Sequence, residues 1–169
     1  AGIGYGDGDD ATVLDDMRDG YTTICMLHSF QVDDPGAVET LILQVDYDDG
    51  FVAYINGAEV ARRNVNGVPP AYNATASGSH EAGAAETIDI SDAAGLLVAG
   101  ANVLAIQMHN RALDSSDLSM IPALLNRRYL PGSSSTMIDG IDALKALLHV
   151  LGVYSRRQLQ AVLAEFWEN

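Results

Sequence analysis

Hydrophobic and polar side chains alternate with a period of two over much of the segment from residue 21 to about residue 125. The alternation is clearest in residues 41–48, where the apolar positions include Leu41, Leu43, Val45 and Tyr47. This period is typical of a β-strand with one buried face, because successive side chains in a strand point to opposite sides. Shorter apolar runs predict further strands at residues 23–27, 51–55, 58–62, 87–90 and 103–109.

Turn signals separate the predicted strands. Asn56-Gly57 lies between two of them and favours a type I′ hairpin, because both residue types tolerate a positive φ. Residues 92–98 are predicted to form a short helical turn, and residues 67–85, rich in Pro, Ala, Gly and Ser, a long surface loop. The Gly- and Asp-rich residues 1–20 are also predicted to be a loop. The expected fold class is therefore mainly β, an antiparallel β-sandwich or jelly roll.

The apolar pattern changes to a helical period after residue 135. We expect a sandwich at residues 1–130, a linker at residues 131–135 and a hairpin of two helices at residues 136–169. The second predicted helix has an apolar face formed by Leu159, Val162, Leu163, Phe166 and Trp167. Two short helices bury too little surface to be stable alone. We therefore expect this face to pack on the sandwich, on a second copy of the chain or on another protein.

The composition is that of a globular domain with an acidic surface. The chain has 23 acidic and nine basic residues, a net charge of −14. Such a surface repels phosphate backbones, which argues against nucleic acid as a partner, and it suits divalent cations. No apolar run reaches the roughly 18 residues that a membrane span requires. The chain has no basic-then-apolar leader, so we expect any export signal to have been removed or never to have been part of it.

The residue types that usually carry catalysis do not form a recognisable motif in this sequence. His28, His80, His109 and His149 lack metal-ligand spacing, and no Gly-x-Ser-x-Gly, zinc-ligand or phosphate-loop pattern occurs. Cys25 is the only cysteine and lies in an apolar run, so we expect a buried thiol that packs as a small hydrophobic side chain. These observations favour a protein that is not an enzyme by itself.

Several segments resemble galactose-binding-like jelly rolls. Residues 46–60, DYDDGFVAYINGAEV, resemble the hairpin of these domains, and residues 97–110, LVAGANVLAIQMHN, resemble a strand of the sugar-binding domains of family 2 glycoside hydrolases. Residues 4–7 and 30–35 are similar to flanking segments of accessory domains in bacterial secreted multidomain proteins. The resemblance covers roughly residues 3–125.

This resemblance implies a β-sandwich that is extracellular or at the cell surface and that accompanies other modules. Such domains usually carry a further stretch, including a strand with a tryptophan, before the Gly-Tyr-Gly segment that starts here at Gly4. We therefore expect the first strand to be absent, cut off or supplied by another chain. The predicted helical tail has no counterpart in the family pattern, which favours one piece of a larger assembly.

Clustered carboxylates near the beginning of the chain form the first candidate site. Asp7, Asp9 and Asp10 lie in a Gly-rich segment, and Ca²⁺ prefers six to eight oxygen ligands from such flexible loops. The resemblance adds that these folds often hold a structural Ca²⁺. The segment lacks the spacing of an EF-hand, and a solvated acidic loop explains the same residues.

Candidate ligand-binding residues are scattered over the predicted sandwich: Tyr72, Arg62, Arg63, Asp48 and Asp49. Tyr72 lies in the long loop, where its ring is available to stack on a sugar. Asp48 and Asp49 stand between two predicted strands, where turn chemistry also explains them. They are not expected to act as a general acid and base, because neighbouring strand residues point to opposite faces.

The sequence thus favours a non-catalytic extracellular binding module, carbohydrate-binding or adhesive and stabilised by Ca²⁺, with a glycan or another protein chain as its partner. Two alternatives stay open. One is a structural protein that uses the helical hairpin to form a homo-oligomer or to dock on a larger polypeptide. The other is an accessory domain of a larger secreted hydrolase.

Overall fold

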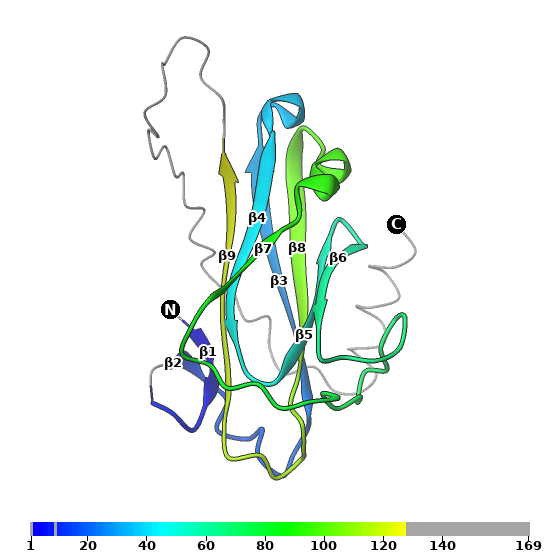
Figure 1. Ribbon diagram of the computed structural model, residues 1–169. Coiled ribbons are helices and arrows are strands. Elements are labelled where there is room, and N and C mark those ends of the chain that lie inside the picture. The colour runs from blue at the N-terminus through cyan, green and yellow to red at the C-terminus, as the bar shows by residue number, and fades with distance from the viewer. Residues whose placement is uncertain (1, 9, 128–169) are drawn as a thin grey trace.

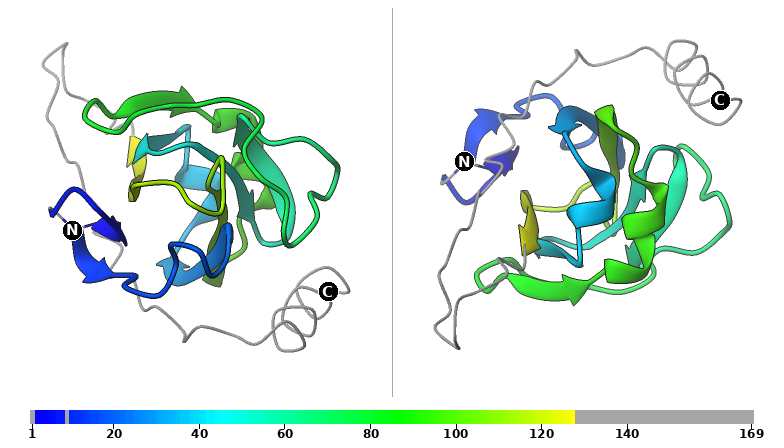
Figure 2. Two further views of the ribbon diagram at one scale, coloured as in Figure 1. Left: turned by 90° about the horizontal axis from the view of Figure 1, so that it is seen from below. Right: turned by 90° about the horizontal axis from the view of Figure 1, so that it is seen from above.

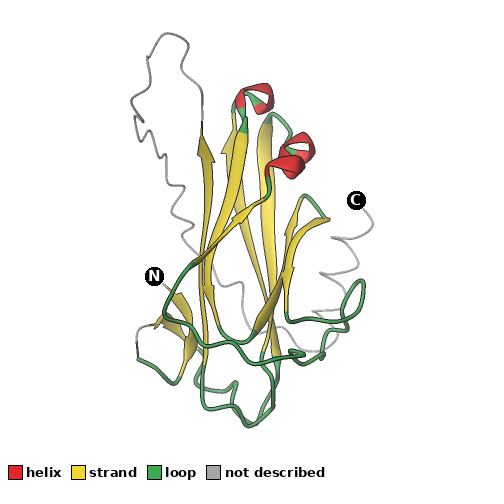
Figure 3. Cartoon of the chain, in the orientation of Figure 1, coloured by secondary structure: helices red, strands yellow, loops and turns green. Residues whose placement is uncertain are grey.

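The structure, a computed structural model, describes residues 2–8 and 10–127. The strands are β1 (Gly2–Tyr5), β2 (Asp10–Val13), β3 (Thr23–Val32), β4 (Thr40–Tyr47), β5 (Gly50–Ile55), β6 (Ala58–Arg63), β7 (Glu86–Asp89), β8 (Gly100–His109) and β9 (Leu118–Arg127). Two short 3₁₀ helices, η1 (Pro35–Ala37) and η2 (Ser91–Leu96), complete the described elements (Figure 3). No helix in this part of the chain is long and apolar enough to cross a membrane.

The strands form two sheets that face each other (Figures 1 and 2). Sheet A has the strand order β2-β1-β9-β4-β7, and sheet B has the order β3-β8-β5-β6. All pairs are antiparallel except β1–β2, which is parallel. The prediction of a mainly β fold with an antiparallel sandwich is confirmed. The predicted linker and helical hairpin lie outside the described residues.

One hydrophobic core lies between the sheets. In β4 the residues predicted to face inward are buried, with exposed fractions of 3% or less, and those between them are not. Phe51, Ala53 and Ile55 of β5 and Ile106 and Met108 of β8 contribute from the opposite sheet. The other face of β5 is buried as well, and there Val52 and Tyr54 form a second small cluster. Strand β5 is therefore covered on both faces, which explains its continuous apolar run.

The predicted turns are confirmed where strong local signals mark them. Asn56 and Gly57 join β5 to β6 with φ values of 48° and 85°, which is the backbone that a type I′ turn requires. The predicted helical turn is the 3₁₀ helix η2. The long loop is also present, and we call residues 64–85, which join β6 to β7, the strap.

The prediction that residues 1–20 form only a loop is wrong. Strand β1 pairs with both β2 and β9, so it lies inside sheet A. Its glycines provide close packing: a Cβ at Gly4 would collide with the carbonyl oxygen of Leu118 and lie 2.7 Å from a carboxylate oxygen of Asp10. Glycine at this point marks a close approach of backbones rather than the chain flexibility that we inferred from it.

The chain passes between the sheets repeatedly at one end of the sandwich, which we call the site end. Three connections meet there: Asp48-Asp49 between β4 and β5, the strap, and residues 110–117 between β8 and β9 (Figure 1). Helices η1 and η2 lie at the opposite end. The site end thus brings together three segments that are far apart in sequence.

Replacing Gly4 with valine tests the close packing of β1. We expect Gly4→Val to lower the free energy of unfolding by about 1–3 kcal/mol, because the new side chain forces β1 away from β9. Chemical denaturation measures the loss. Gly95→Ala is the control, since no heavy atom lies within 4 Å of a Cβ placed there. Equal stability of the two variants would contradict the close packing.

Candidate functional site

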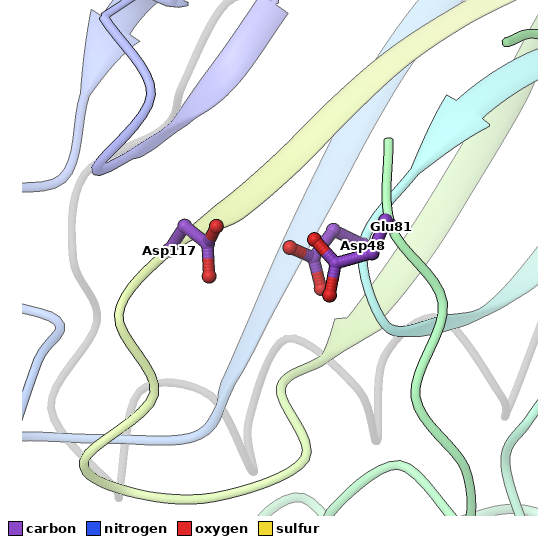
Figure 4. Close-up of side chains that lie close together, drawn as sticks. All are labelled: Asp48, Glu81 and Asp117. Atoms are coloured by element: carbon purple, nitrogen blue, oxygen red, sulfur yellow. The ribbon is translucent and has the colours of Figure 1, made fainter. Parts of the chain in front are cut away.

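Three carboxyl groups converge at the site end. Asp48 follows β4, Glu81 belongs to the strap, and Asp117 immediately precedes β9. One carboxylate oxygen of each lies within 4.8 Å of the others, and the side chains point toward one another (Figure 4). Asp48 is buried with an exposed fraction of 5%, Asp117 is half-buried and Glu81 is exposed. We call these three residues the acidic cluster. It is open to solvent on the side of Glu81.

The charge of Asp48 is poorly compensated by the protein. Burial, followed by the nearby charge of Asp49 and a hydrogen bond to it, raises the pKa of Asp48 to about 8. The charges of Asp117 and Glu81 raise it further. The charged groups of the described residues that raise this pKa most, Asp49, Asp117 and Glu81, are all acidic, so they favour either a proton or an external cation at Asp48.

Asp49 has a different environment, although it is equally buried. One of its carboxylate oxygens accepts a hydrogen bond from the backbone N–H of His80 at 3.1 Å, and the other accepts from the N–H of Arg111 at 2.8 Å. The Asn64 side chain donates to its carbonyl oxygen at 2.9 Å. Asp49 therefore ties the strap and the β8–β9 connection to the same point, and these two segments carry Glu81 and Asp117.

The strap is held beside Asp48 by the residue that precedes Glu81. The His80 ring stacks on Tyr47 with centroids 4.0 Å apart and planes 8° apart. Its Nδ1 donates to the Tyr47 carbonyl oxygen at 2.8 Å. Tyr47 is the last residue of β4, so this contact places Glu81 next to the residue that follows β4.

A second polar group fixes the β8–β9 connection. The side chain of Asn110, which is 1% exposed, donates to the Tyr5 hydroxyl at 2.9 Å and to the Asp117 carbonyl oxygen at 3.2 Å. The Tyr5 hydroxyl donates in turn to the Ser115 carbonyl oxygen at 2.9 Å. Strand β1, which the sequence did not predict, thus helps to position Asp117.

The spacing of the acidic cluster suits a divalent cation. Two oxygen ligands about 2.4 Å from one Ca²⁺ are at most about 4.8 Å apart, and Ca²⁺ takes carboxylate and carbonyl oxygens in irregular arrangements. Mg²⁺ requires ligands at about 2.1 Å in a near-octahedral arrangement, which suits this open cluster less well. Three carboxylates supply only part of a Ca²⁺ shell, so carbonyl oxygens, water or a bound ligand would complete it.

The structure brings Asp48 and Asp49 together more closely than the sequence analysis assumed. The two residues do not continue a strand, and the peptide bond between them is cis. Both side chains are buried at the crossing between the sheets, and the two carboxyl groups lie within hydrogen-bonding reach. The premise that they point to opposite faces is therefore wrong. Their predicted role in ligand binding stays a prediction.

The predicted cation ligands near the beginning of the chain are not members of the acidic cluster. Asp7 accepts a hydrogen bond from the Ser119 hydroxyl at 2.8 Å, and Asp10 lies in β2 beside the glycines of β1. Asp9 lies outside the described residues. The candidate site that these three residues form stays a prediction.

The other predicted ligand residues are distributed over the strap and β6. Arg62 pairs with Glu59 at 2.7 Å and also donates to the carbonyl oxygens of Val65 and Gly67. Arg63 pairs with Glu86 at 2.5 Å. Tyr72 is half-buried in the strap. The two arginines thus have internal partners, and the structure does not bring them into the acidic cluster.

Two further expectations concern single residues. Cys25 is half-buried on β3, and burial raises the pKa of its thiol to about 12, so the thiol is protonated at neutral pH. His28 and His109 lie on adjacent strands of sheet B, but their partners in register are Leu104 and Thr23 respectively, so they do not meet. The predicted interface residues of the helical tail lie outside the described residues.

Sequence reasoning missed Glu81 and Asp117. Glu81 lies in a loop of low complexity, and Asp117 follows a run of small and polar residues. Neither has a spacing to Asp48 that would indicate a shared site. Only the return of three connections to one end of the sandwich brings these carboxylates together.

No protein-family model and no curated protein matches this chain. Among solved structures it is similar to α-L-rhamnosidase from Aspergillus terreus, with 20% identity, a TM-score of 0.40 and coverage of 63% of this chain and 12% of that one. It is also similar to β-D-mannosidase from Dictyoglomus thermophilum, with 18% identity, a TM-score of 0.33 and coverage of 52% and 9%. A third is the PA14 domain of the antifreeze protein MpAFP, with 17% identity, a TM-score of 0.34 and coverage of 75% and 50%. At these TM-scores the likenesses carry no argument about function, and the galactose-binding-like family stays a resemblance of sequence motifs.

Replacing Asp49 tests whether it organises the site end. Asp49→Ala leaves two backbone N–H groups without their acceptor, so we expect the free energy of unfolding to fall by roughly 2–4 kcal/mol. Asp46→Ala is the matched control, because Asp46 accepts one exposed hydrogen bond from the strap, from Gly83. Denaturant titration compares the two variants. A loss no greater than that of the control would show that Asp49 does not hold the connections together.

Proposed function

We propose that this chain is a non-catalytic binding module whose ligand site is a Ca²⁺ ion held by the acidic cluster at the site end. The observation that carries the proposal is the buried carboxyl group of Asp48, which faces two further carboxylates and whose pKa is raised by its acidic neighbours among the described residues. A divalent cation neutralises this arrangement and makes the buried charge favourable.

The arrangement of the cluster supports binding rather than acid–base catalysis. Glycoside hydrolases use two carboxyl groups about 5–5.5 Å or 6.5–9.5 Å apart with the substrate between them. In the acidic cluster one oxygen from each of three carboxyl groups lies within 4.8 Å of the others, so all three can contact a single ion. A sugar would instead approach from the exposed side, where Glu81 lies.

We further propose that the ligand is a glycan and that the protein works outside the cell. The motifs that resemble galactose-binding-like domains support this choice. Vicinal hydroxyl groups of a sugar are neutral oxygen donors, so they can complete a Ca²⁺ shell that three carboxylates leave unfilled. The Ca²⁺ concentrations found outside cells also suit a site with few protein ligands.

Calcium titration tests the cation site. In the absence of a cation, Asp48 binds a proton more tightly in the folded than in the unfolded chain, so its contribution to stability falls as pH rises toward about 8. We expect Ca²⁺ at pH 7.5 to restore this stability, by about 2.7 kcal/mol at 100 times its Kd. Isothermal titration calorimetry and thermal unfolding with and without chelator measure binding and stabilisation.

Two variants give the controls for this titration. Asp48→Asn should abolish the stabilisation by Ca²⁺ and remove the fall in stability between pH 5 and pH 8 in chelator. Asp114→Asn, an exposed acid in the same connection as Asp117, should leave both unchanged. Stabilisation by Ca²⁺ that persists in Asp48→Asn would place the ion elsewhere, and Asp7 and Asp10 would then be replaced in turn.

A glycan array tests the ligand. We expect the wild-type chain to bind neutral glycans in the presence of Ca²⁺, and to lose at least about 90% of the signal in chelator or in Asp48→Asn, because the ion bridges protein and sugar. Asp114→Asn should bind like the wild type. Absence of binding to neutral and acidic glycans, with calorimetry showing a bound Ca²⁺, would leave the ion a structural role and refute the glycan ligand.

A further inference from the structure

The strap lies across the end of sheet B, where backbone hydrogen bonds hold it to the residue after β8 and to its own first residue after β6. The N–H of Ala76 donates to the Asn110 carbonyl oxygen at 3.0 Å, and the N–H of Ser77 donates to that of Asn64 at 2.7 Å. Ala76 is buried, and a Cβ at Gly50 would lie 3.2 Å from its methyl group. The strap therefore sits directly over the beginning of β5.

A fully buried histidine lies under this part of the strap. His109, the last residue of β8, has no exposed surface. Its Nδ1 lies 2.8 Å from the Ala74 carbonyl oxygen, to which the Thr23 hydroxyl also donates at 3.0 Å. Because a carbonyl oxygen only accepts, Nδ1 carries the proton of the neutral ring. The imidazole is thus one of two donors that fasten Ala74 to the sheet.

The other ring nitrogen, Nε2, has no hydrogen-bond acceptor for a proton among the described residues. Nε2 of His109 is buried and makes no hydrogen bond with the described part of the chain. Protonation would place an N–H and a positive charge there without an acceptor, which is strongly unfavourable in a buried position. The ring must therefore reach water when it becomes charged.

Among the described residues, no negative charge shifts the pKa of His109. Its partners in register are Thr23 on β3 and Gly50 on β5, and the strap contributes the Ala74 carbonyl group. Cys25, also on β3, is a neutral thiol. Burial, with a smaller contribution from the positive charge of Arg62 on β6, lowers the pKa of His109, whereas its hydrogen bond to Ala74 raises it.

We propose that His109 is an acid-operated latch: its neutral ring fastens the strap over the end of sheet B, and its protonation releases the strap. Opening the strap moves Glu81 away from Asp48 and takes the His80 N–H away from Asp49. Release of Ca²⁺ in acid would follow, and this consequence rests on the proposed function. The latch itself does not require a cation.

The latch has the opposite pH dependence from Asp48, so the two effects can be separated. A lowered pKa in the folded chain means that His109 contributes stability above its ordinary pKa of about 6.5, and that this stability is lost as pH falls. Asp48 contributes stability in acid and loses it as pH rises. In chelator, acid should therefore loosen the strap while it relieves the charge of Asp48.

Hydrogen exchange of the strap tests the latch. In chelator, and after correction for intrinsic rates, we expect the protection of the Ala76 and Ser77 amides to fall about thirtyfold from pH 7.5 to pH 5, because the open state gains a proton on a histidine of ordinary pKa and the closed state does not. Amides of the β5–β8 ladder should keep their protection. His109→Asn, which retains a donor near Nδ1 but does not titrate, should change by less than about twofold.

The matched control is His28→Asn, on the neighbouring strand, which should behave like the wild type. Nitrogen chemical shifts of the wild-type His109 ring provide a second readout that needs no folded variant. We expect a neutral ring with its proton on Nδ1 at every pH at which the strap amides are protected. We expect a charged ring only at the pH values at which these amides exchange rapidly. A charged ring under a protected strap, or equal acid sensitivity of the wild type and His109→Asn, would overturn the latch. If the wild-type chain does not bind Ca²⁺ at pH 7.5, the proposed function is refuted and the latch is unaffected.

Discussion

Two adjacent carboxyl groups are removed from water at the point where the chain crosses from sheet A to sheet B, and the site end is built around them. A buried carboxylate is costly unless it receives hydrogen bonds or an opposite charge. Asp49 receives two backbone N–H donors, from His80 and Arg111, and so fastens the strap and the β8–β9 connection. Asp48 receives acidic neighbours instead. The difference between the two residues separates a structural contact, at Asp49, from the cation site that we propose at Asp48.

Burial of apolar side chains in the sandwich core offsets the free-energy cost of these two buried carboxyl groups. The sheets contribute a continuous set of fully buried apolar side chains, among them Leu43, Phe51 and Met108. Such a core can keep a connection folded in an unfavourable electrostatic environment. Functional sites are commonly less stable than their surroundings, and the rest of the fold compensates for the difference. The acidic cluster is therefore placed at the end of the sandwich, where its outer side meets solvent, rather than within the core.

The strap contacts two of the electrostatically unusual places among the described residues. On one side it contacts Asp49 and Tyr47 through His80, and on the other it is fastened by His109 through Ala74. A change of charge at either place acts on the same backbone segment. The cation binding and the histidine protonation that we propose would therefore act through the same loop, although His109 is not a member of the acidic cluster.

Local sequence signals predicted most of the sheets. The alternation in residues 41–48 and the Asn56-Gly57 turn are confirmed because each depends on the conformation of a few neighbouring residues. The prediction of a loop at residues 1–20 was wrong because a glycine in a loop and a glycine in a crowded strand look the same in sequence. The premise that the side chains of Asp48 and Asp49 point to opposite faces failed for a related reason, because it assumed strand geometry where the chain turns between the sheets.

The sequence by itself determined the β-sandwich, its central hairpin and the presence of a long loop after it. It also placed Asp48 and Asp49 among the candidate ligand residues. Only the tertiary structure decided that Glu81 and Asp117 stand beside Asp48, and that His109 lies beneath the strap. These contacts join residues separated by more than 30 positions, so no periodicity or spacing records them. They arise because successive connections between the two sheets return to the same end of the sandwich.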